Sequence, residues 1–228
     1  MIGLTAILRK EVKNLLNSGW GVFLINALIA VAWSFMLFYE YGLVGSDFGI
    51  WSIFFASIVA SNFSGTVFIS ERVSGTLEVL IVSGVTRDAV LFGKVFFVAA
   101  ATLVMGVVCA AVSAVWLCLM ADEGTAASEI ALWSGRVFRG AFLYVGAAVL
   151  NVSASAYLSV RMGNPRFLNF ANLFITGAAM AVYGLVSIMF DRRDHTTFVL
   201  IFSALGALFL FLARREFAGE RITRPVIF

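Results

Sequence analysis

The chain has 228 residues, of which 61% are hydrophobic and 13% are charged, with a formal net charge of +3. This apolar share exceeds that of a soluble globular domain, in which roughly half of the residues are apolar. The apolar residues collect in runs close to the length of about 20 residues that crosses a bilayer core. Because the backbone in lipid must satisfy its own hydrogen bonds, such runs are expected to be helices. Composition therefore predicts an all-α integral membrane protein and excludes a soluble one.

The first predicted element is an amphipathic helix over residues 3–18. Its basic residues Arg9, Lys10 and Lys13 fall on one side, and four apolar residues recur at helical spacing on the other: Leu4, Leu8, Val12 and Leu15. This pattern is typical of an interfacial helix at the inner membrane surface, with basic side chains that reach lipid phosphates. The alternative is a simple polar tail before the first span.

Six apolar runs follow, and each is a predicted transmembrane helix: residues 21–38, 50–69, 92–120, 137–160, 167–190 and 197–213. The connection at residues 161–166 has the Gly-Asn-Pro chemistry of a tight turn. No internal repeat or separate soluble domain is visible in the sequence. We therefore expect residues 1–228 to form a single transmembrane domain.

The distribution of Lys and Arg predicts the orientation of the spans. With a cytoplasmic N-terminus, all but four of the 16 basic residues lie on the inside, the exceptions being Arg136, Arg139, Arg192 and Arg193. An even number of spans then leaves both termini in the cytoplasm. The same assignment places the polar segment between the second and third spans, residues 70–91, on the cytoplasmic side.

This cytoplasmic segment mixes charges with apolar residues. Glu71 and Arg72 precede a Ser-Gly-Thr run, after which Ser74 suits the N-cap of a short helix with Glu78 in its first turns. The apolar side of that helix would hold Leu77, Leu80 and Ile81. An exposed helix of this kind suits a groove on a partner protein. The alternative is a loop that only joins two spans. Thr86 or Asp88 is expected to cap the helix that follows.

The order of these residues, continued by Gly93 and Lys94 at the entry to the next span, resembles the ABC-2 family of ATP-driven transport permeases. The resemblance implies that the segment contains a coupling helix pressed against a separate ATPase subunit. It implies coupling roles for seven residues: Glu71, Arg72, Ser74, Gly75, Thr76, Leu77 and Glu78. It also implies an exporter in a bacterial or archaeal inner membrane. Two copies of this chain, or this chain and a related permease, would join two ATPase subunits, and small haem-exporter permeases have a similar length and layout.

The sequence offers no catalytic machinery of its own. It lacks a Gly-x-x-x-x-Gly-Lys-Ser/Thr phosphate loop, and it has a single histidine, His195. We expect no enzyme activity, cofactor or metal in this chain and no nucleic-acid partner, with ATP and Mg²⁺ held by the partner ATPase. The spans are also expected to lack charged residues, which ion-driven carriers usually keep at their working site.

Polar stripes on three spans are the only sign of a transport route. Ser57 and Ser61 share a face of the second span, Asn172 and Thr176 share a face of the fifth, and Asn151 begins a stripe on the fourth. The resemblance implies that the second and fifth spans line the route at a dimer axis. Aromatic neighbours such as Phe54 then favour a hydrophobic or amphipathic substrate. The alternative is that these residues hold helices together.

Two other classes of function compete with transport. The chain would act as a scaffold or assembly factor if residues 70–91 recruited a cytoplasmic partner without any substrate being moved. An intramembrane enzyme is disfavoured by the lack of a catalytic cluster.

Overall fold

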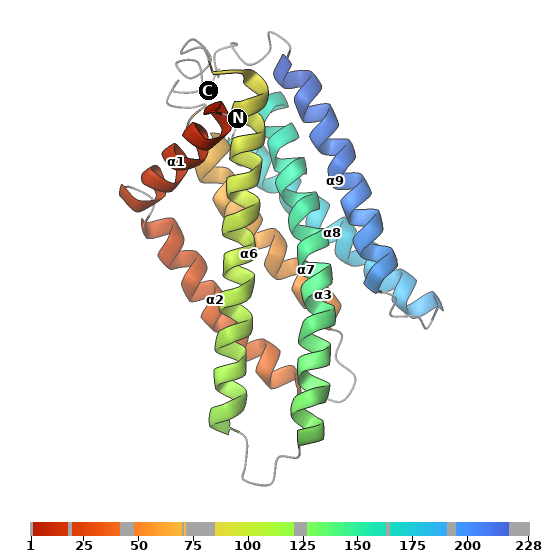
Figure 1. Cartoon of the computed structure of the whole chain (residues 1–228). Coiled ribbons are helices and arrows are strands. Elements are labelled where there is room, and N and C mark those ends of the chain that lie inside the picture. Colours follow the sequence, from red (N-terminus) through yellow and green to blue (C-terminus); the bar gives the residue numbers. More distant parts are fainter. Residues whose placement is uncertain are drawn as a thin grey trace.

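The computed structural model describes residues 2–17, 20–41, 48–69, 71, 85–120, 127–162, 165–190 and 195–218, and almost all of them are helical. The helices are α1 (Ile2–Asn17), α2 (Trp20–Tyr41), α3 (Phe48–Ser64), α6 (Arg87–Met120), α7 (Ala127–Arg161), α8 (Pro165–Phe190) and α9 (His195–Ala218), and a π-helical turn, η1 (Gly65–Ile69), continues α3. They form an elongated bundle, with α1 and the end of α9 at the same end (Figure 1). We call this end the α1 end.

Five of these helices are long and apolar enough to cross a membrane: Gly49–Phe68, Arg87–Trp116, Val137–Arg161, Phe170–Met189 and His195–Phe217. They coincide with the second to sixth predicted spans. The first predicted span falls on α2, which adds a sixth only if it is counted together with α1, and the two helices meet at 82°. The all-helical prediction is therefore confirmed with five spans, and the sixth stays a prediction.

The third span begins earlier than predicted. Thr86 caps α6, since its hydroxyl oxygen accepts a hydrogen bond from the Ala89 backbone N–H at 3.3 Å. A Thr at this position satisfies one of the free N–H groups of the first helical turn. Of the two candidate caps, Thr86 therefore fills the role, and Asp88 instead lies in the first turn of the helix.

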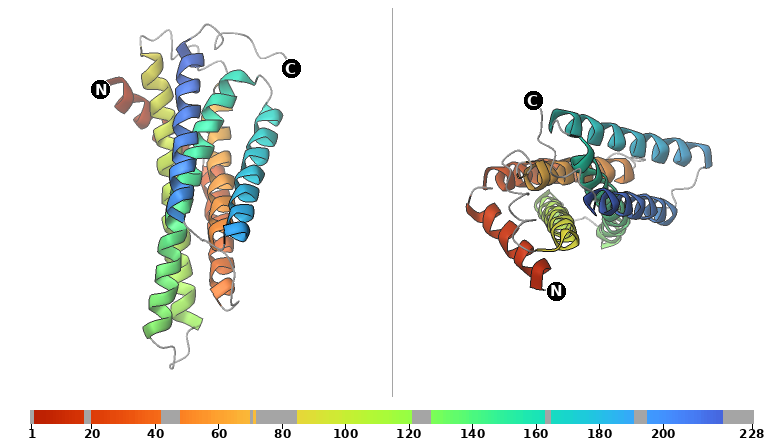
Figure 2. Two further views of the ribbon diagram at one scale, coloured as in Figure 1. Left: turned by 90° about the vertical axis from the view of Figure 1, so that its right-hand side faces the viewer. Right: turned by 90° about the horizontal axis from the view of Figure 1, so that it is seen from above.

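The bundle is built around α7, which packs against α9 and α3. Glycines let α7 and α9 approach closely. A Cβ atom added at Gly206 would lie 2.9 Å from Cγ1 of Val149, and one added at Gly146 would lie 3.2 Å from the Cα of Val199. Small residues at such crossings are typical of helices that pack within a bilayer. Seen from above, α8 lies on the opposite side of the bundle from α1 (Figure 2).

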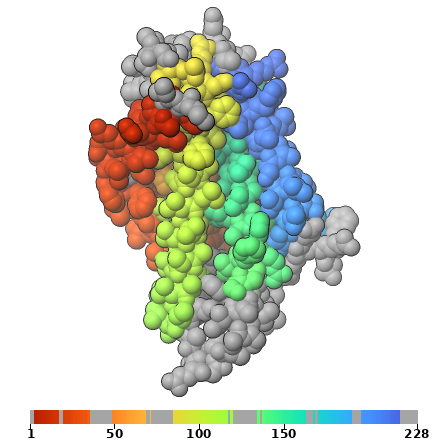
Figure 3. Space-filling view, viewed as in Figure 1, coloured from red at the N-terminus to blue at the C-terminus, as the bar shows by residue number. Residues whose placement is uncertain are grey.

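The outward faces of the spans are strongly apolar. Leu28, Val107 and Ile188 are 69%, 69% and 81% exposed, and many other large apolar side chains are also exposed. In Figure 3, α6 extends down the middle of one such face, beside α2 and α7. Because soluble monomers rarely expose contiguous apolar surface of this extent, these faces support contact with lipid.

The amphipathic N-terminal helix is present as α1, and its buried face matches the predicted one in part, since Leu8 and Leu15 pack against the core. Ile7 and Glu11 are its most buried side chains, at 2% and 3% exposure, whereas Val12 is 47% exposed. The face turned toward α6 thus includes a carboxylate and excludes Val12. The sequence pattern missed this because Glu11 has charged partners on distant segments.

Candidate functional site: a buried ion cluster at the α1 end

The predicted coupling segment has one described residue at its start, Glu71. The other six proposed coupling residues lie outside the described part of the chain: Arg72, Ser74, Gly75, Thr76, Leu77 and Glu78. Description resumes at Val85, just before α6. Glu71 is therefore the last described residue before the greater part of the predicted coupling segment.

Glu71 belongs to a cluster of four charged side chains from three parts of the chain. The Lys94 ammonium from α6 lies 2.5 Å from Oε2 of Glu71 and 3.2 Å from Oε1 of Glu11. Lys10 donates a hydrogen bond to Oε1 of Glu71 and lies 3.5 Å from Glu11. We call these four residues the ion cluster. Two carboxylates and two ammonium groups balance one another within it.

Burial distinguishes the ion cluster from surface ion pairs. The Lys94 side chain is fully buried, and those of Glu11 and Glu71 are 4% and 9% exposed, whereas that of Lys10 is 30% exposed. Taking charges out of water carries a large desolvation cost, which only close pairing offsets. Removing one of the inner partners would therefore leave an uncompensated buried charge.

Lys94 also connects the ion cluster to the end of α3. Its ammonium donates a hydrogen bond of 2.7 Å to the backbone carbonyl of Val67 in η1 and lies 5.8 Å from the centre of the Phe68 ring. Carbonyl groups in the last turn of a helix lack partners within the helix, and a cation there is stabilised by the helix dipole. One side chain of α6 thus holds both α1 and the final turn before Glu71.

The neighbouring glycine explains how α1 comes close enough. A Cβ atom added at Gly93 would lie 2.7 Å from Cγ2 of Ile7 on α1, so any larger residue would push the helices apart. Gly93 therefore provides the close approach, and Lys94 provides the charge that Glu11 needs. The Gly-Lys pair at the start of the predicted span has a structural role in joining α1 to α6.

The two carboxyl groups respond differently to the ion cluster. Burial raises the pKa of Glu11, and the nearby Glu71 carboxylate adds to this effect against the attraction of Lys94. Burial would also raise the pKa of Glu71, but Lys94 and Lys10 outweigh it, so that this pKa falls below its ordinary value. The pKa of Glu71 therefore lies below that of Glu11, because both ammonium groups are closer to Glu71 than to Glu11.

Two expectations change in light of this arrangement. The expectation that the spans lack charged residues is wrong, because Lys94 lies inside the apolar helix Arg87–Trp116 and is completely buried. Glu71, expected at a surface that docks a partner, is 7% exposed and directs its carboxylate toward Lys94 and Lys10 of its own chain. Its contact with an ATPase stays a prediction.

A second ion pair closes the same end of the bundle on the α9 side. Arg214 near the end of α9 donates two hydrogen bonds to Asp88 at the start of α6, of 3.2 Å and 2.7 Å. Both side chains are about half exposed, so this pair contributes at most about 1 kcal/mol. The start of α6 is thereby connected to α9 as well as to α1.

The polar stripes of the spans meet inside the chain. Asn151 on α7 donates a hydrogen bond of 2.8 Å to the Ser57 hydroxyl on α3, and the Thr176 hydroxyl on α8 donates one of 3.4 Å to the side-chain amide oxygen of Asn151. Ser61 and Asn172 are paired at 3.4 Å. The stripes of α3, α7 and α8 thus form one contact between helices.

This placement bears on the predicted transport route. Ser57, Asn172 and Thr176 are each 5% exposed or less, and each also takes part in a hydrogen bond that joins two helices of one chain. Phe54 packs against Trp33 with ring centres 5.4 Å apart. The arrangement supports the helix-contact alternative for this chain, and a cleft between two copies stays a prediction.

Sequence reasoning underrated two asparagines. Asn151 occupies the centre of the polar contact, although its stripe was expected to matter least. Asn26 on α2 accepts a hydrogen bond of 3.1 Å from Asn62 on α3. The sequence did contain a signal for both: an unpaired amide side chain is costly in lipid, so an Asn within a predicted span is expected to have a hydrogen-bond partner.

Known proteins add no family assignment to this geometry, since no family model, curated protein or solved structure matches the chain.

Proposed function

We propose that the chain is the membrane-spanning permease subunit of an ATP-driven exporter, which works as a dimer with two copies of a separate ATPase. The substrate would be a hydrophobic or amphipathic molecule. The ion cluster is the observation on which the proposal depends most. It connects the beginning of the 72–84 segment to α1 and α6, so a force applied to that segment would reach two helices at once.

The position of the ion cluster supports this proposal over a passive loop. Glu71 is the last described residue before the segment, and Lys94 binds Glu71, Glu11 and the end of η1 together. A segment that only joined two spans would need no buried charges at its base. Buried charges cost desolvation energy, but they hold the segments that carry them in one defined geometry. We infer that this geometry serves to transmit movement of the ATPase.

In this proposal Glu71 acts within the chain. It fixes the orientation of the segment, while residues beyond it, such as Leu77, contact the ATPase. The sequence lacks a phosphate loop, which supports a separate energy-supplying subunit. The basic residues near the ends of the helices also support a cytoplasmic α1 end, because Arg87, Arg161 and Arg214 all lie there.

The test is a copurification experiment with a charge placed on the segment. We expect the chain purified from its native membranes to bring with it an ATPase that contains a phosphate loop, and Leu77→Asp to release that ATPase. The same change at Thr125, predicted on the opposite side of the membrane, is the control and should retain it. Retention by Leu77→Asp would contradict the coupling role of the segment. A partner that binds no nucleotide would favour the scaffold function.

A further inference from the structure

The outward face of α1 combines basic and apolar side chains. Four exposed residues recur at helical spacing along this face: Arg9, Val12, Lys13 and Leu16. The two apolar ones, Val12 and Leu16, are 47% and 54% exposed. All four lie on the side of the helix away from Glu11, which is turned into the ion cluster. We call these four residues the outward stripe.

The positive charge of the outward stripe has no counter-charge in the described part of the chain. Neither Arg9 nor Lys13 forms an ion pair there. Lys10, which lies beside them in the sequence, is instead paired with Glu71 and Glu11. Glu11 is the one acidic residue of α1 and is only 3% exposed, so it cannot balance the stripe. The stripe therefore presents two positive charges one helical turn apart.

The outward stripe lies at the depth where lipid phosphates are expected. Glu11 contacts Lys94, which also binds the carbonyl of Val67, one residue before the end of the span Gly49–Phe68. α1 thus passes the bundle where that span ends and the polar headgroup region begins. Trp20 at the start of α2 is 53% exposed, as is typical of aromatic side chains at this interface. Seen from above, α1 lies along the edge of the bundle, where lipid can reach it (Figure 2).

The mixture of side chains in the outward stripe favours a lipid over a free anion. At the boundary between headgroups and acyl chains, Val12 and Leu16 reach hydrocarbon while Arg9 and Lys13 reach phosphates. A free phosphate would leave both apolar side chains in water. A zwitterionic lipid carries its own cation beside the phosphate, and this cation would be repelled by Arg9 and Lys13. A lipid with net negative charge has no such group.

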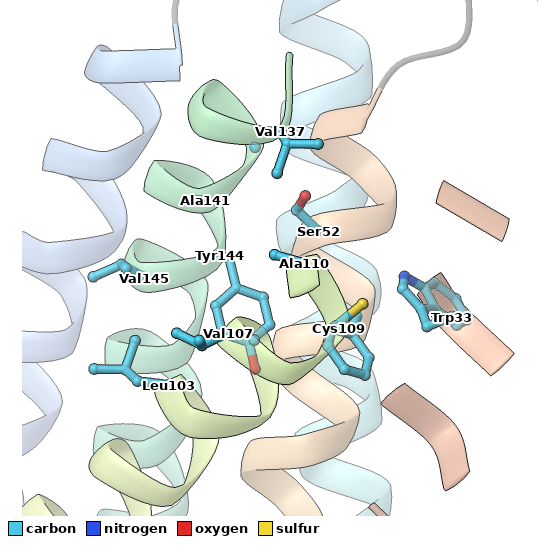
Figure 4. A pocket seen from close by; sticks show the side chains of 13 residues that line it. Trp33, Ser52, Leu103, Val107, Cys109, Ala110, Val137, Ala141, Tyr144 and Val145 are labelled. Carbon is cyan, nitrogen blue, oxygen red and sulfur yellow. The ribbon is translucent and has the colours of Figure 1, made fainter. Parts of the chain in front are cut away.

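The largest opening in the described bundle has a different chemistry. Figure 4 shows a cavity of about 360 Å³ between α3, α6 and α7, beside Trp33 of α2, and no charged residue lines it. Its Tyr144 hydroxyl is already bonded to the Thr102 carbonyl at 2.6 Å. This cavity therefore cannot distinguish an anionic lipid from a zwitterionic one, whereas the outward stripe can.

We propose that the outward stripe binds the headgroup of a phospholipid with net negative charge, of the phosphatidylglycerol type. Its phosphate lies between Arg9 and Lys13, and its acyl chains lie beside Val12 and Leu16. The bound lipid holds α1 in the membrane surface and thereby supports the position of Glu11 in the ion cluster. This inference does not depend on an ATPase partner.

The test compares two photoactivatable lipids, a phosphatidylglycerol and a phosphatidylcholine, that carry the same diazirine on the same acyl chain. The full chain, with any partner that copurifies, is reconstituted in phosphatidylcholine vesicles that contain either probe, and labelled residues are identified by mass spectrometry. Labelling of α1 is divided by that of Leu28, which is 69% exposed in an uncharged stretch of α2. The lipid preference is the ratio of this quantity for the two probes. We expect about a 25-fold preference for phosphatidylglycerol, because each of the two basic residues contributes about five-fold, or about 1 kcal/mol.

Arg9→Gln and Lys13→Gln should each lower the lipid preference about five-fold, and the double variant should abolish it. Gln is a good helix former, and neither change breaks an ion pair among the described residues, so the variants should fold. The matched control is Arg161→Gln/Arg215→Gln, which removes the same charge from exposed positions at the same end of the bundle and should keep the preference. Raising the ionic strength to about 1 M should also weaken the preference, because charges are then screened within about 3 Å.

Four results would overturn the proposal. Equal labelling of α1 by both probes would show that the outward stripe does not select a charged lipid. A preference that survives in Arg9→Gln/Lys13→Gln would place the anionic lipid elsewhere, and an equal fall in the control would show only an effect of net charge. Leu28 labelled without any label on α1 would mean that a protein covers the stripe. None of these results bears on whether an ATPase copurifies.

Discussion

Lys94 determines the geometry of the α1 end, because among the described residues it alone contacts Glu11, Glu71 and the Val67 carbonyl. Its partners come from segments 83 and 27 residues away in the chain. A lysine in an apolar helix normally reaches toward the membrane surface, whereas this one is fully enclosed. Each of its contacts satisfies part of the charge that burial would otherwise leave uncompensated.

Replacing Lys94 with Met should therefore destabilise the protein strongly. The change keeps an apolar stem of similar length but removes the buried cation and leaves Glu11 and Glu71 with only the partly exposed Lys10, at a cost of about 3–5 kcal/mol. Lys13→Met, at an exposed position on α1, is the control and should be nearly neutral. Denaturation in detergent, followed by circular dichroism, measures both. Equal stability of the two variants would show that the ion cluster is not structurally important.

The coupling between Lys94 and Glu71 gives a second test at this scale. Glu71→Gln removes the carboxylate that lies closest to Lys94. The double variant Lys94→Met/Glu71→Gln lacks both members of this ion pair, so it should be more stable than the sum of the single changes predicts. Residues in direct contact commonly deviate from additivity by about 0.5–3 kcal/mol. Strict additivity would mean that the two residues do not interact.

Two polar residues one turn apart on α7 allow a matched comparison. Asn151 bonds Ser57 on α3, whereas the buried Ser155 hydroxyl has no hydrogen-bond partner within the described residues. Asn151→Ala should cost about 1 kcal/mol, in the range measured for hydrogen bonds between membrane helices. Ser155→Ala should cost less, because no bond is lost. Thermal unfolding in detergent would contradict this account if the order were reversed.

At the scale of elements, the close contact of α1 with α6 can be tested by a crosslink. A Cβ atom at Gly3 would lie 3.3 Å from that of Ala89, close to the separation of about 3.5–4.5 Å in disulfides. In a background without Cys109 and Cys118, the pair Gly3→Cys/Ala89→Cys should oxidise readily. Adding Gly93→Leu should prevent it, since the larger side chain displaces Ile7.

The control for this crosslink uses the opposite face of α1. Thr5 is exposed and, two residues from Gly3, points away from it. Thr5→Cys/Ala89→Cys should therefore not oxidise. Equal crosslinking of both pairs would indicate that α1 is not held against α6 in one orientation.

The elements themselves were largely predictable, and their contacts were not. The need for a continuous apolar run fixes each span, which is why the predicted runs coincide with α3, α6, α7, α8 and α9. The buried face of α1 was predicted in part: Leu8 and Leu15 pack against the core, but an apolar periodicity gives no reason to bury Glu11 beside them. Its burial is compensated by Lys94 of α6, which contacts it at 3.2 Å, and a one-dimensional pattern contains no information about that contact.

The same limit applies to the polar stripes. Their spacing correctly indicated that each helix has one polar face, but it did not predict the hydrogen bond between Ser57 and Asn151 on α7. That pairing depends on how α3, α7 and α8 are arranged around one another. The candidate site was thus half predictable: Glu71 and Lys94 were identified individually, and the ion cluster that joins them was not.

At the scale of the whole molecule, the arrangement predicts which connections face the cytoplasm. The α1 end carries the ion cluster, Arg161 and the end of α9. Single cysteines at Ser74, Asn164 and Thr223, in a background without Cys109 and Cys118, should therefore react with an impermeant reagent only after the membrane is opened. Cysteines at Ser46, Thr125 and Thr196 should react in intact cells. Labelling of position 74 in intact cells would contradict both the orientation and the coupling role.

The central claim is that this chain is half of a membrane unit driven by a separate ATPase. Its most direct test is the mass of the intact complex extracted from native membranes, measured by native mass spectrometry. We predict an assembly with two membrane subunits and two ATP-binding subunits, in which Lys94→Met weakens retention of the ATP-binding subunits. A chain that is extracted without any ATP-binding subunit, under conditions that keep its own fold intact, would contradict the claim.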